Sequence, residues 1–158
     1  MKLFPLNPSH ISQIIELESA AHVTPWTEKI ISSSFGPRSR NVGLFKSHKG
    51  FDELVGYYFA EFVAGEMTLE NICVGIQFQG KDHAKTLMQH LFEDAERLNA
   101  EEIWLEVRAS NATAIQLYSN FGFEQISVRK NYYSIPDSNE KEDALLMKKA
   151  LRQQGKVD

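Results

Sequence analysis

Glu106, Asn111 and Tyr118 are the residues of this chain whose types and spacing best suit chemistry, and they fall within thirteen positions. A carboxylate can accept a proton, a phenol can donate one, and an amide can hold a ligand by hydrogen bonds. Glu106 alone would more simply be a solvated strand residue, and Tyr118 alone a packed aromatic. Together with Asn111 they indicate a site for proton transfer, although the three residues alone do not specify the reaction.

Two short elements are expected to position these side chains. Apolar residues alternate along 103–107, so Glu106 should point to the opposite face of a strand. Ser110 or Asn111 can cap a helix over 112–120 that ends at Gly122. Because seven residues make about two helical turns, Asn111 and Tyr118 should lie on one side of that helix. A strand carboxylate and a helix phenol would then flank one crevice.

Length and composition favour a single soluble domain over residues 1–152, with 153–158 as a frayed tail. The 158 residues are 42% hydrophobic and 24% charged, which allows a substantial core. The N-terminus carries no apolar run typical of a signal peptide, and no later stretch is long enough to span a membrane, so we expect a cytoplasmic protein. Cys73 is the single cysteine, which excludes an intramolecular disulfide and a four-ligand zinc site made from thiolates.

The charge pattern narrows the class of partner. The formal net charge is −4 and no segment concentrates Lys or Arg, so we expect no direct contact with nucleic acid and a preference for a basic partner. His83 and His90 share a helix face, but no third ligand is evident near them in the sequence. We therefore expect no metal site.

The remaining pattern predicts an α/β order. Helices are expected from a Ser9 cap to Ala21, after a Thr27 cap, and over an amphipathic stretch that ends near Asn99. Further strands are expected at Asn41–Ser47, Glu53–Val63, Thr68–Val74, Phe123–Tyr132 and Ala144–Ala150. The first three of these form an antiparallel meander. The long helix that follows should be a crossover that places 103–107 parallel to 68–74.

This order resembles the GNAT acyl-CoA N-acyltransferase superfamily, and within it the bacterial ribosomal-protein alanine N-acetyltransferases. The resemblance covers nearly the whole chain and is carried by Pro25 to Lys29, Trp104 to Asn111, Leu117-Tyr118, Gly122-Phe123, Arg129 to Tyr133 and Glu142 to Ala144. It implies a mixed, mostly antiparallel sheet with a central parallel strand pair, flanked by about four helices. It further implies a monomer that transfers acetyl from acetyl-CoA to the N-terminal alanine of a basic, small-subunit ribosomal protein.

The resemblance also assigns roles to individual residues. Glu106 would be the general base for the amine, and Tyr118 the general acid for the departing CoA thiolate. The cofactor would be held by the main chain of Ile72, Cys73 and Val74, by Asn111, and by a pyrophosphate loop formed by Gly80, Lys81, Asp82, His83, Ala84 and Lys85. The peptide groove would be walled by Trp26, Tyr132 and Tyr133, with Asp143 facing a basic residue of the peptide.

Asp82 departs from the superfamily's pyrophosphate loop, in which a glycine stands at this position. The carboxylate brings negative charge toward two phosphates, and as a cap of the following helix it would compete for the same N–H groups. Lys81, His83 and Lys85 flank it and offset the charge. We expect weaker CoA binding rather than none.

Two other functions stay open at this point. The same fold serves acetyltransferases that act on a lysine side chain, a small amine or another protein terminus. A chain with a disabled cofactor loop would instead be a binding module that lacks turnover.

Overall fold

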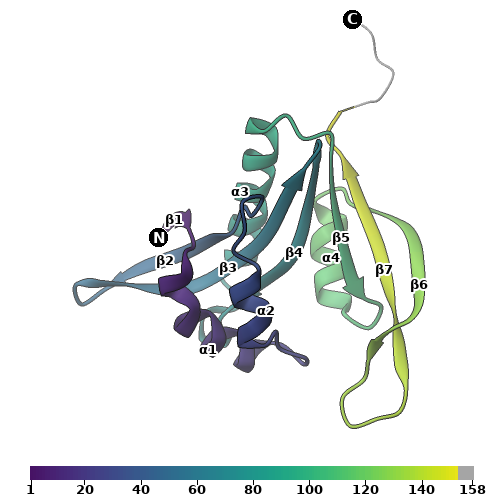
Figure 1. The fold of residues 1–158 in the computed structure, drawn as a ribbon, viewed down its shortest axis with the longest axis horizontal. Helices are drawn as coiled ribbons and strands as arrows, with labels where there is room; N and C mark the ends of the chain where they lie inside the picture. Colours follow the sequence, from purple (N-terminus) through teal and green to yellow (C-terminus); the bar gives the residue numbers. More distant parts are fainter. Residues whose placement is uncertain (153–158) are drawn as a thin grey trace, which may run out of the picture.

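The computed structural model describes residues 1–152 as a seven-stranded sheet covered by helices on both faces (Figure 1). The predicted tail, 153–158, lies outside the described residues. The strand order is β1-β2-β3-β4-β5-β7-β6. The strands are β1 (Lys2–Pro5), β2 (Val42–His48), β3 (Phe51–Val63), β4 (Glu66–Val74), β5 (Glu102–Arg108), β6 (Glu124–Ser134) and β7 (Lys141–Ala150). The helices are α1 (Ile11–Ala21), α2 (Glu28–Ser33), α3 (His83–Arg97) and α4 (Ala112–Asn120), with short 3₁₀ helices η1 (Pro8–His10) and η2 (Ile76–Phe78).

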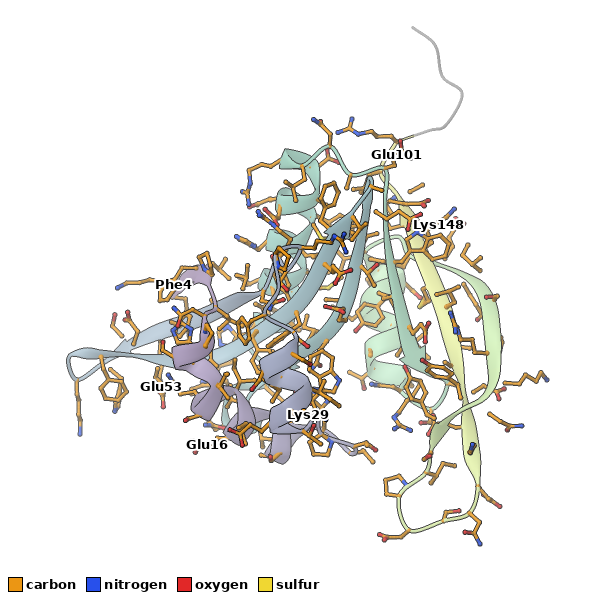
Figure 2. The ribbon with its side chains drawn as sticks, in the orientation of Figure 1. Phe4, Glu16, Lys29, Glu53, Glu101 and Lys148 are labelled. Carbon is orange, nitrogen blue, oxygen red and sulfur yellow. The ribbon has the colours of Figure 1, made fainter. Side chains whose placement is uncertain are left out.

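The core has two parts, one on each face of the sheet. Ile14, Leu17 and Ile31 of α1 and α2 pack with Tyr57 and Phe59 on one face. The other face carries α3 and α4, which pack with residues of the central strands in a larger cluster that includes Leu87, Met88, Leu91, Tyr118, Ile103, Leu105 and Val107. Charged side chains such as Glu16 and Lys29 lie on the exposed side of their helices (Figure 2). Within residues 1–152 no helix is long and apolar enough to cross a membrane.

Strands β4 and β5 form the predicted parallel pair, and they stay paired over only part of their length. The register runs from Glu66 opposite Glu102 to Leu69 opposite Leu105. Beyond Leu69, β4 remains paired with β3 as far as Val74, while β5 continues along β7. The two central strands therefore separate, and no strand within residues 1–152 lies beside the β5-facing edge of β4 over 70–74.

The predicted helices are confirmed, with one change at the first. We expected Ser9 to cap helix α1, but η1 comes first and Asn7 caps it, its side chain accepting a hydrogen bond from the Ser9 N–H at 2.9 Å. Proline at the start of a 3₁₀ turn explains the extra element. Thr27 caps α2 as predicted, by accepting from the Ile30 N–H at 3.2 Å. Strand β1 was not predicted.

Candidate active site

A cavity of about 1010 Å³ lies between strand β4, the start of α3 and helix α4. The predicted cofactor-binding residues Ile72, Cys73, Val74, Gly80, Asp82, His83, Ala84, Lys85 and Asn111 line it, whereas Lys81 is not among its lining residues. With Ala21 and His22, which also line it, four segments that are far apart in the sequence supply one cavity. Its size is in the upper range for ligand sites.

The loop before α3 and the first turn of that helix line this cavity. Gly80 has φ +79° and Asp82 has φ +62°, both in the left-handed region. The prediction that the Asp82 side chain caps α3 is wrong, because a capping side chain needs an extended backbone at that position and Asp82 makes no such hydrogen bond. The first turn of α3 therefore keeps its N–H groups for another acceptor, as an anion site at a helix N-terminus requires.

Asn111 caps α4 and also lines the cavity. Its Oδ1 accepts a hydrogen bond from the Ala114 N–H at 3.1 Å, while the Ser110 hydroxyl donates to Glu142 at 2.7 Å. The structure thus decides between the two possible caps in favour of Asn111. The side-chain N–H groups of Asn111 are the part of it that can donate to a ligand.

Glu106 lies on the face of β5 opposite Leu105 and Val107, as the alternation predicted. That face is turned toward the loop between α1 and α2, since the neighbouring Arg108 donates from Nη2 to the Thr24 hydroxyl at 3.1 Å. The Glu106 carboxylate forms an ion pair with Arg129, with Nε to Oε1 at 3.1 Å. The Glu106 carboxylate is therefore held in place by an arginine on β6.

Tyr118 belongs to the core cluster on the other face of the sheet, where its ring centroid lies 5.9 Å from that of Phe123. Burial, with a smaller contribution from Tyr133, raises the pKa of the Tyr118 hydroxyl, so the phenol stays protonated at neutral pH. Neither Glu106 nor Tyr118 is among the residues that line the cavity. Burial and then the Glu106 charge raise the pKa of Tyr133. Tyr133 in turn contributes to the raised pKa of Tyr118.

The predicted groove residues lie around the same strand face. The Trp26 N–H donates to Glu18 at 2.8 Å, and the Trp26 ring meets Phe59 edge-on. Tyr132 is exposed and Tyr133 is half-buried, with their ring centroids 5.0 Å apart. One ring of the pair therefore packs more deeply than the other, as expected for consecutive strand residues.

Asp143 has a local structural role that sequence reasoning did not identify. Its Oδ1 accepts a hydrogen bond from the Asn131 N–H at 3.0 Å, and Asn131 has φ +52°. The pairing of β6 with β7 shifts register between Arg129 and Tyr133. Asp143 thus braces a bulge that sets the direction of the two tyrosines, which limits its freedom to pair with a peptide.

Two residues at or beside the cavity, Glu18 and His22, were not predicted from the sequence. Glu18 is 1% exposed although it is charged, and His22 lines the cavity with Cys73. The signal was present in the sequence, because Glu18 follows Leu17 on the apolar stripe of the first helix. A carboxylate on such a stripe requires polar partners that only the folded chain reveals.

Comparison with known proteins agrees with this geometry. Residues 11–123 match the Acetyltransferase (GNAT) family. The chain is 35% identical over 142 residues to the [ribosomal protein bS18]-alanine N-acetyltransferase of Escherichia coli K12, covering 90% of this chain and 92% of the relative. A putative enzyme of the same name from Bacillus subtilis is 29% identical over 139 residues, 87% of each chain.

Solved structures give the same result. The crystal structure of the ribosomal-protein-S18-alanine N-acetyltransferase from Escherichia coli matches with a TM-score of 0.86 and 31% identity over 99% of both chains. Arabidopsis thaliana NAA60 in complex with acetyl-CoA has a TM-score of 0.81 over 95% of this chain and 98% of that one, at 15% identity, which shows a shared fold. The chain belongs to the GNAT acetyltransferase family. The two Escherichia coli matches reported above, at 35% and 31% identity, are named as alanine N-acetyltransferases of a ribosomal protein.

Proposed function

We propose that this protein transfers the acetyl group of acetyl-CoA to the α-amine of an N-terminal alanine on a small-subunit ribosomal protein. The support for the acceptor is the 35% identity over 90% of the chain to an enzyme named for ribosomal protein bS18. A ribosomal target implies action in the cytoplasm. We further propose that residues 1–152 form one catalytic domain and that the protein acts as a monomer.

The observation that carries the cofactor assignment is the separation of β4 from β5 beyond Leu69 and Leu105. Along 72–74 the main chain of β4 has no neighbouring strand on that side in the described part of the chain, so its N–H and C=O groups can pair with an extended amide chain such as pantetheine. The first turn of α3, at one wall of the same cavity, suits the pyrophosphate. Lys81 and Lys85 add positive charge to that loop.

The chemistry requires a proton to leave the amine and another to reach the sulfur. An α-amino group titrates near ~7.7 to 8.0, so at neutral pH most of it is protonated and a base assists its attack. Glu106 takes that proton, directly or through one water. The amine nitrogen bonds to the acetyl carbon, the C–S bond breaks, and the buried Tyr118 hydroxyl donates to the departing thiolate. The products are the N-acetylated terminus and CoA.

The acceptor groove suits a peptide that enters between the α1–α2 loop and the β6–β7 hairpin. Trp26 lies on one side, and Tyr132 and Tyr133 lie on the other, with Glu106 between them on β5. The acidic net charge of −4 supports a basic partner. A lysine side chain or a small free amine could be acetylated by the same chemistry. None of the relatives described above is named for either acceptor.

A peptide comparison tests the acceptor. The purified protein is incubated with acetyl-CoA and a peptide that begins Ala-Arg and carries an internal lysine, and the modified atom is located by fragmentation mass spectrometry. The matched control peptide has the same sequence with a formylated N-terminus. Acetylation of the free α-amine alone is the expected result, whereas equal acetylation of the lysine in both peptides would contradict the proposal.

A further inference from the structure

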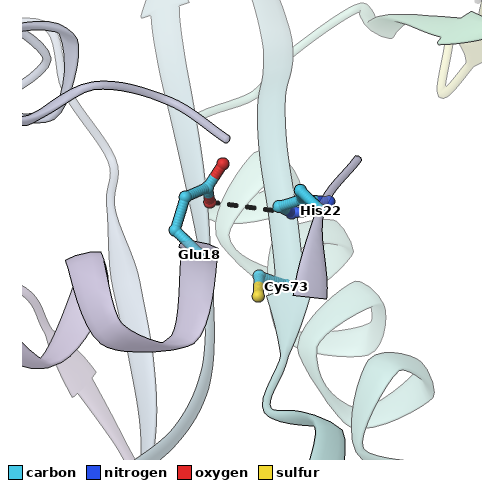
Figure 3. A group of neighbouring side chains, drawn as sticks. All are labelled: Glu18, His22 and Cys73. Atoms are coloured by element: carbon cyan, nitrogen blue, oxygen red, sulfur yellow. Dashed lines mark ion pairs between the residues drawn. The ribbon is translucent and has the colours of Figure 1, made fainter. Parts of the chain in front are cut away.

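Glu18, His22 and Cys73 bring three different metal-binding atoms together beside the cofactor cavity (Figure 3). Their ligand atoms all lie within 4.8 Å of one another, and His22 Nε2 is 3.6 Å from Glu18 Oε1. Glu18 and His22 are one turn apart at the end of α1, whereas Cys73 is on β4. The i, i+4 spacing of Glu18 and His22 can serve two ligands, but only the fold brings Cys73 to them.

Two of the three atoms lack a strong partner in the described structure. Among residues 1–152, His22 Nε2 is a buried nitrogen with no hydrogen-bond partner. The Cys73 thiol makes only weak contacts: it donates to the Leu17 carbonyl at 3.8 Å and lies within reach of the Tyr57 hydroxyl, which itself donates to Glu18. Buried polar atoms are nearly always hydrogen-bonded, so an imidazole nitrogen without a hydrogen bond beside a carboxylate and a thiol indicates a place that can bind a ligand.

We propose that Glu18, His22 and Cys73 form a binding site for a divalent cation of the zinc class. A carboxylate, a thiolate and a neutral imidazole are the three ligand types that zinc takes in proteins. The carboxylate and the thiolate together carry two negative charges, so a bound divalent ion leaves the buried cluster neutral. On binding, the Cys73 sulfur bonds to the metal and its proton is released to solvent.

The neighbours of Glu18 are arranged as an outer shell for such an ion. Its carboxylate accepts hydrogen bonds from the Tyr57 hydroxyl at 2.5 Å, the Asn71 amide at 2.9 Å and the Trp26 N–H at 2.8 Å. Groups that bond to a ligating carboxylate fix its orientation and strengthen the site. These three donors come from β3, β4 and the α1–α2 loop, so the carboxylate is held before any metal arrives.

The site needs only a small closure. Zinc lies about 2.0 to 2.3 Å from its ligands, so tetrahedral ligand atoms are separated by roughly 3.3 to 3.8 Å and the cluster must contract by about 1 Å. His22 can supply this movement because it follows the last residue of α1, outside the helix. Since His22 and Cys73 both line the cavity, the fourth coordination position opens toward it.

Titration with Co²⁺ under anaerobic, reducing conditions tests the site without any acetyl-transfer assay, so its outcome is independent of the proposed function. A thiolate bonded to Co²⁺ gives a charge-transfer band in the near ultraviolet, and Cys73 is the single cysteine of the chain. We expect a band that saturates at about one Co²⁺ per chain and is displaced by Zn²⁺. The absence of the band in the wild-type protein would overturn the proposal.

Three variants make the test specific. Cys73→Ser should abolish the band, and His22→Gln should weaken metal affinity by at least about tenfold. His48→Gln removes an exposed histidine outside the cluster and should leave the affinity unchanged. Thermal unfolding of each variant checks that it is folded, and Cys73→Ala replaces Cys73→Ser if the serine variant is not. Zinc affinity by calorimetry that is equal in the wild type and both cysteine variants would also overturn the proposal.

Discussion

The Nε atom of Arg129 lies 3.1 Å from Oε1 of Glu106, and the arginine side chain is 54% exposed while the glutamate is 26% exposed. The proposed base is therefore paired to a cation that solvent largely surrounds. Exposed pairs contribute little, typically below about 1 kcal/mol, so the pair orients the carboxylate without tying it up. The Glu106 carboxylate can therefore release Arg129 and form a hydrogen bond with an incoming amine.

Glu106→Gln should lower kcat by about 10² to 10⁴ and leave acetyl-CoA affinity within about twofold, because the amide keeps the shape but cannot accept the proton. Steady-state kinetics and calorimetry measure the two effects. Arg129→Gln is the matched control on the other side of the ion pair, with an expected change in kcat of less than about fivefold. A larger loss for Arg129→Gln than for Glu106→Gln would reverse the two roles.

Tyr118→Phe should lower kcat in the same range, about 10² to 10⁴, while the melting temperature changes little, because the ring keeps its contact with Phe123. Tyr58→Phe is the control, since Tyr58 is also a buried tyrosine but its hydroxyl bonds to His90 at 2.8 Å. That variant should lose about 1 kcal/mol of unfolding free energy and keep its turnover. Equal activity of Tyr118→Phe and wild type would exclude Tyr118 as the acid.

Asp82→Gly should tighten acetyl-CoA binding by about two- to fivefold, because it removes a carboxylate from a helix N-terminus that faces the phosphates. Glycine also adopts the left-handed backbone at Asp82, φ +62°, without steric strain. Calorimetry measures the affinity.

Asp137→Gly provides the control for backbone strain. Asp137 has a similar φ of +58° but lies in the exposed loop between β6 and β7. Both glycine variants should change stability in the same direction, and Asp82→Gly alone should change affinity. Unchanged or weaker acetyl-CoA binding in Asp82→Gly would contradict this account of the loop.

The buried Asp94 anchors helix α3 near its C-terminal end. The Asp94 carboxylate is 2% exposed and accepts from Arg40 at 2.9 and 2.7 Å and from Arg97 at 2.6 Å. Burial acts to raise the pKa of Asp94, but the bonds to the two arginines outweigh it and hold the pKa below its usual value. The stabilising effect is therefore full above the unfolded pKa of about 3.9 and is lost as pH falls through the lower folded pKa.

Asp94→Asn should lower the unfolding free energy at pH 7 by about 1.5 to 3 kcal/mol, the usual worth of a hydrogen bond to a charged group. The difference from wild type should shrink as the pH is lowered below about 3.9. Asp52→Asn, which removes a carboxylate 3.6 Å from Lys2 at the surface, should cost less than about 1 kcal/mol. Denaturant unfolding at several pH values measures both variants, and a pH-independent difference would contradict the assignment.

Local patterns explain why much of the fold could be predicted from the sequence. The alternation along 103–107 and the helix over 112–120 depend on neighbouring residues, and both agree with the structure. The parallel pair followed from the helix between its strands. Strand β1 could not be predicted, because a four-residue strand that ends in proline becomes one only by pairing with β2.

The site was predictable where a motif lies in one segment and not where distant segments meet. Local sequence offered Ser110 or Asn111 as the cap of α4, and the structure selects Asn111. Local sequence also placed residues 80–85 at the start of the long helix. The pairing of Glu106 with Arg129 and the meeting of Glu18, His22 and Cys73 depend on tertiary contacts. The role of Asp143 at a bulge in β6 was missed for the same reason, since the bulge exists only once β6 and β7 pair.

The most direct test of the central proposal is the acetylation state of ribosomal protein bS18 itself. Unacetylated bS18 is incubated with acetyl-CoA and either the wild-type protein or Glu106→Gln, and the intact mass and the modified residue are determined over time. We expect the wild type to add one acetyl group to the N-terminal alanine, and Glu106→Gln to do so more slowly by about 10² or more. No acetylation of that alanine, or equal rates for the two proteins, would contradict it.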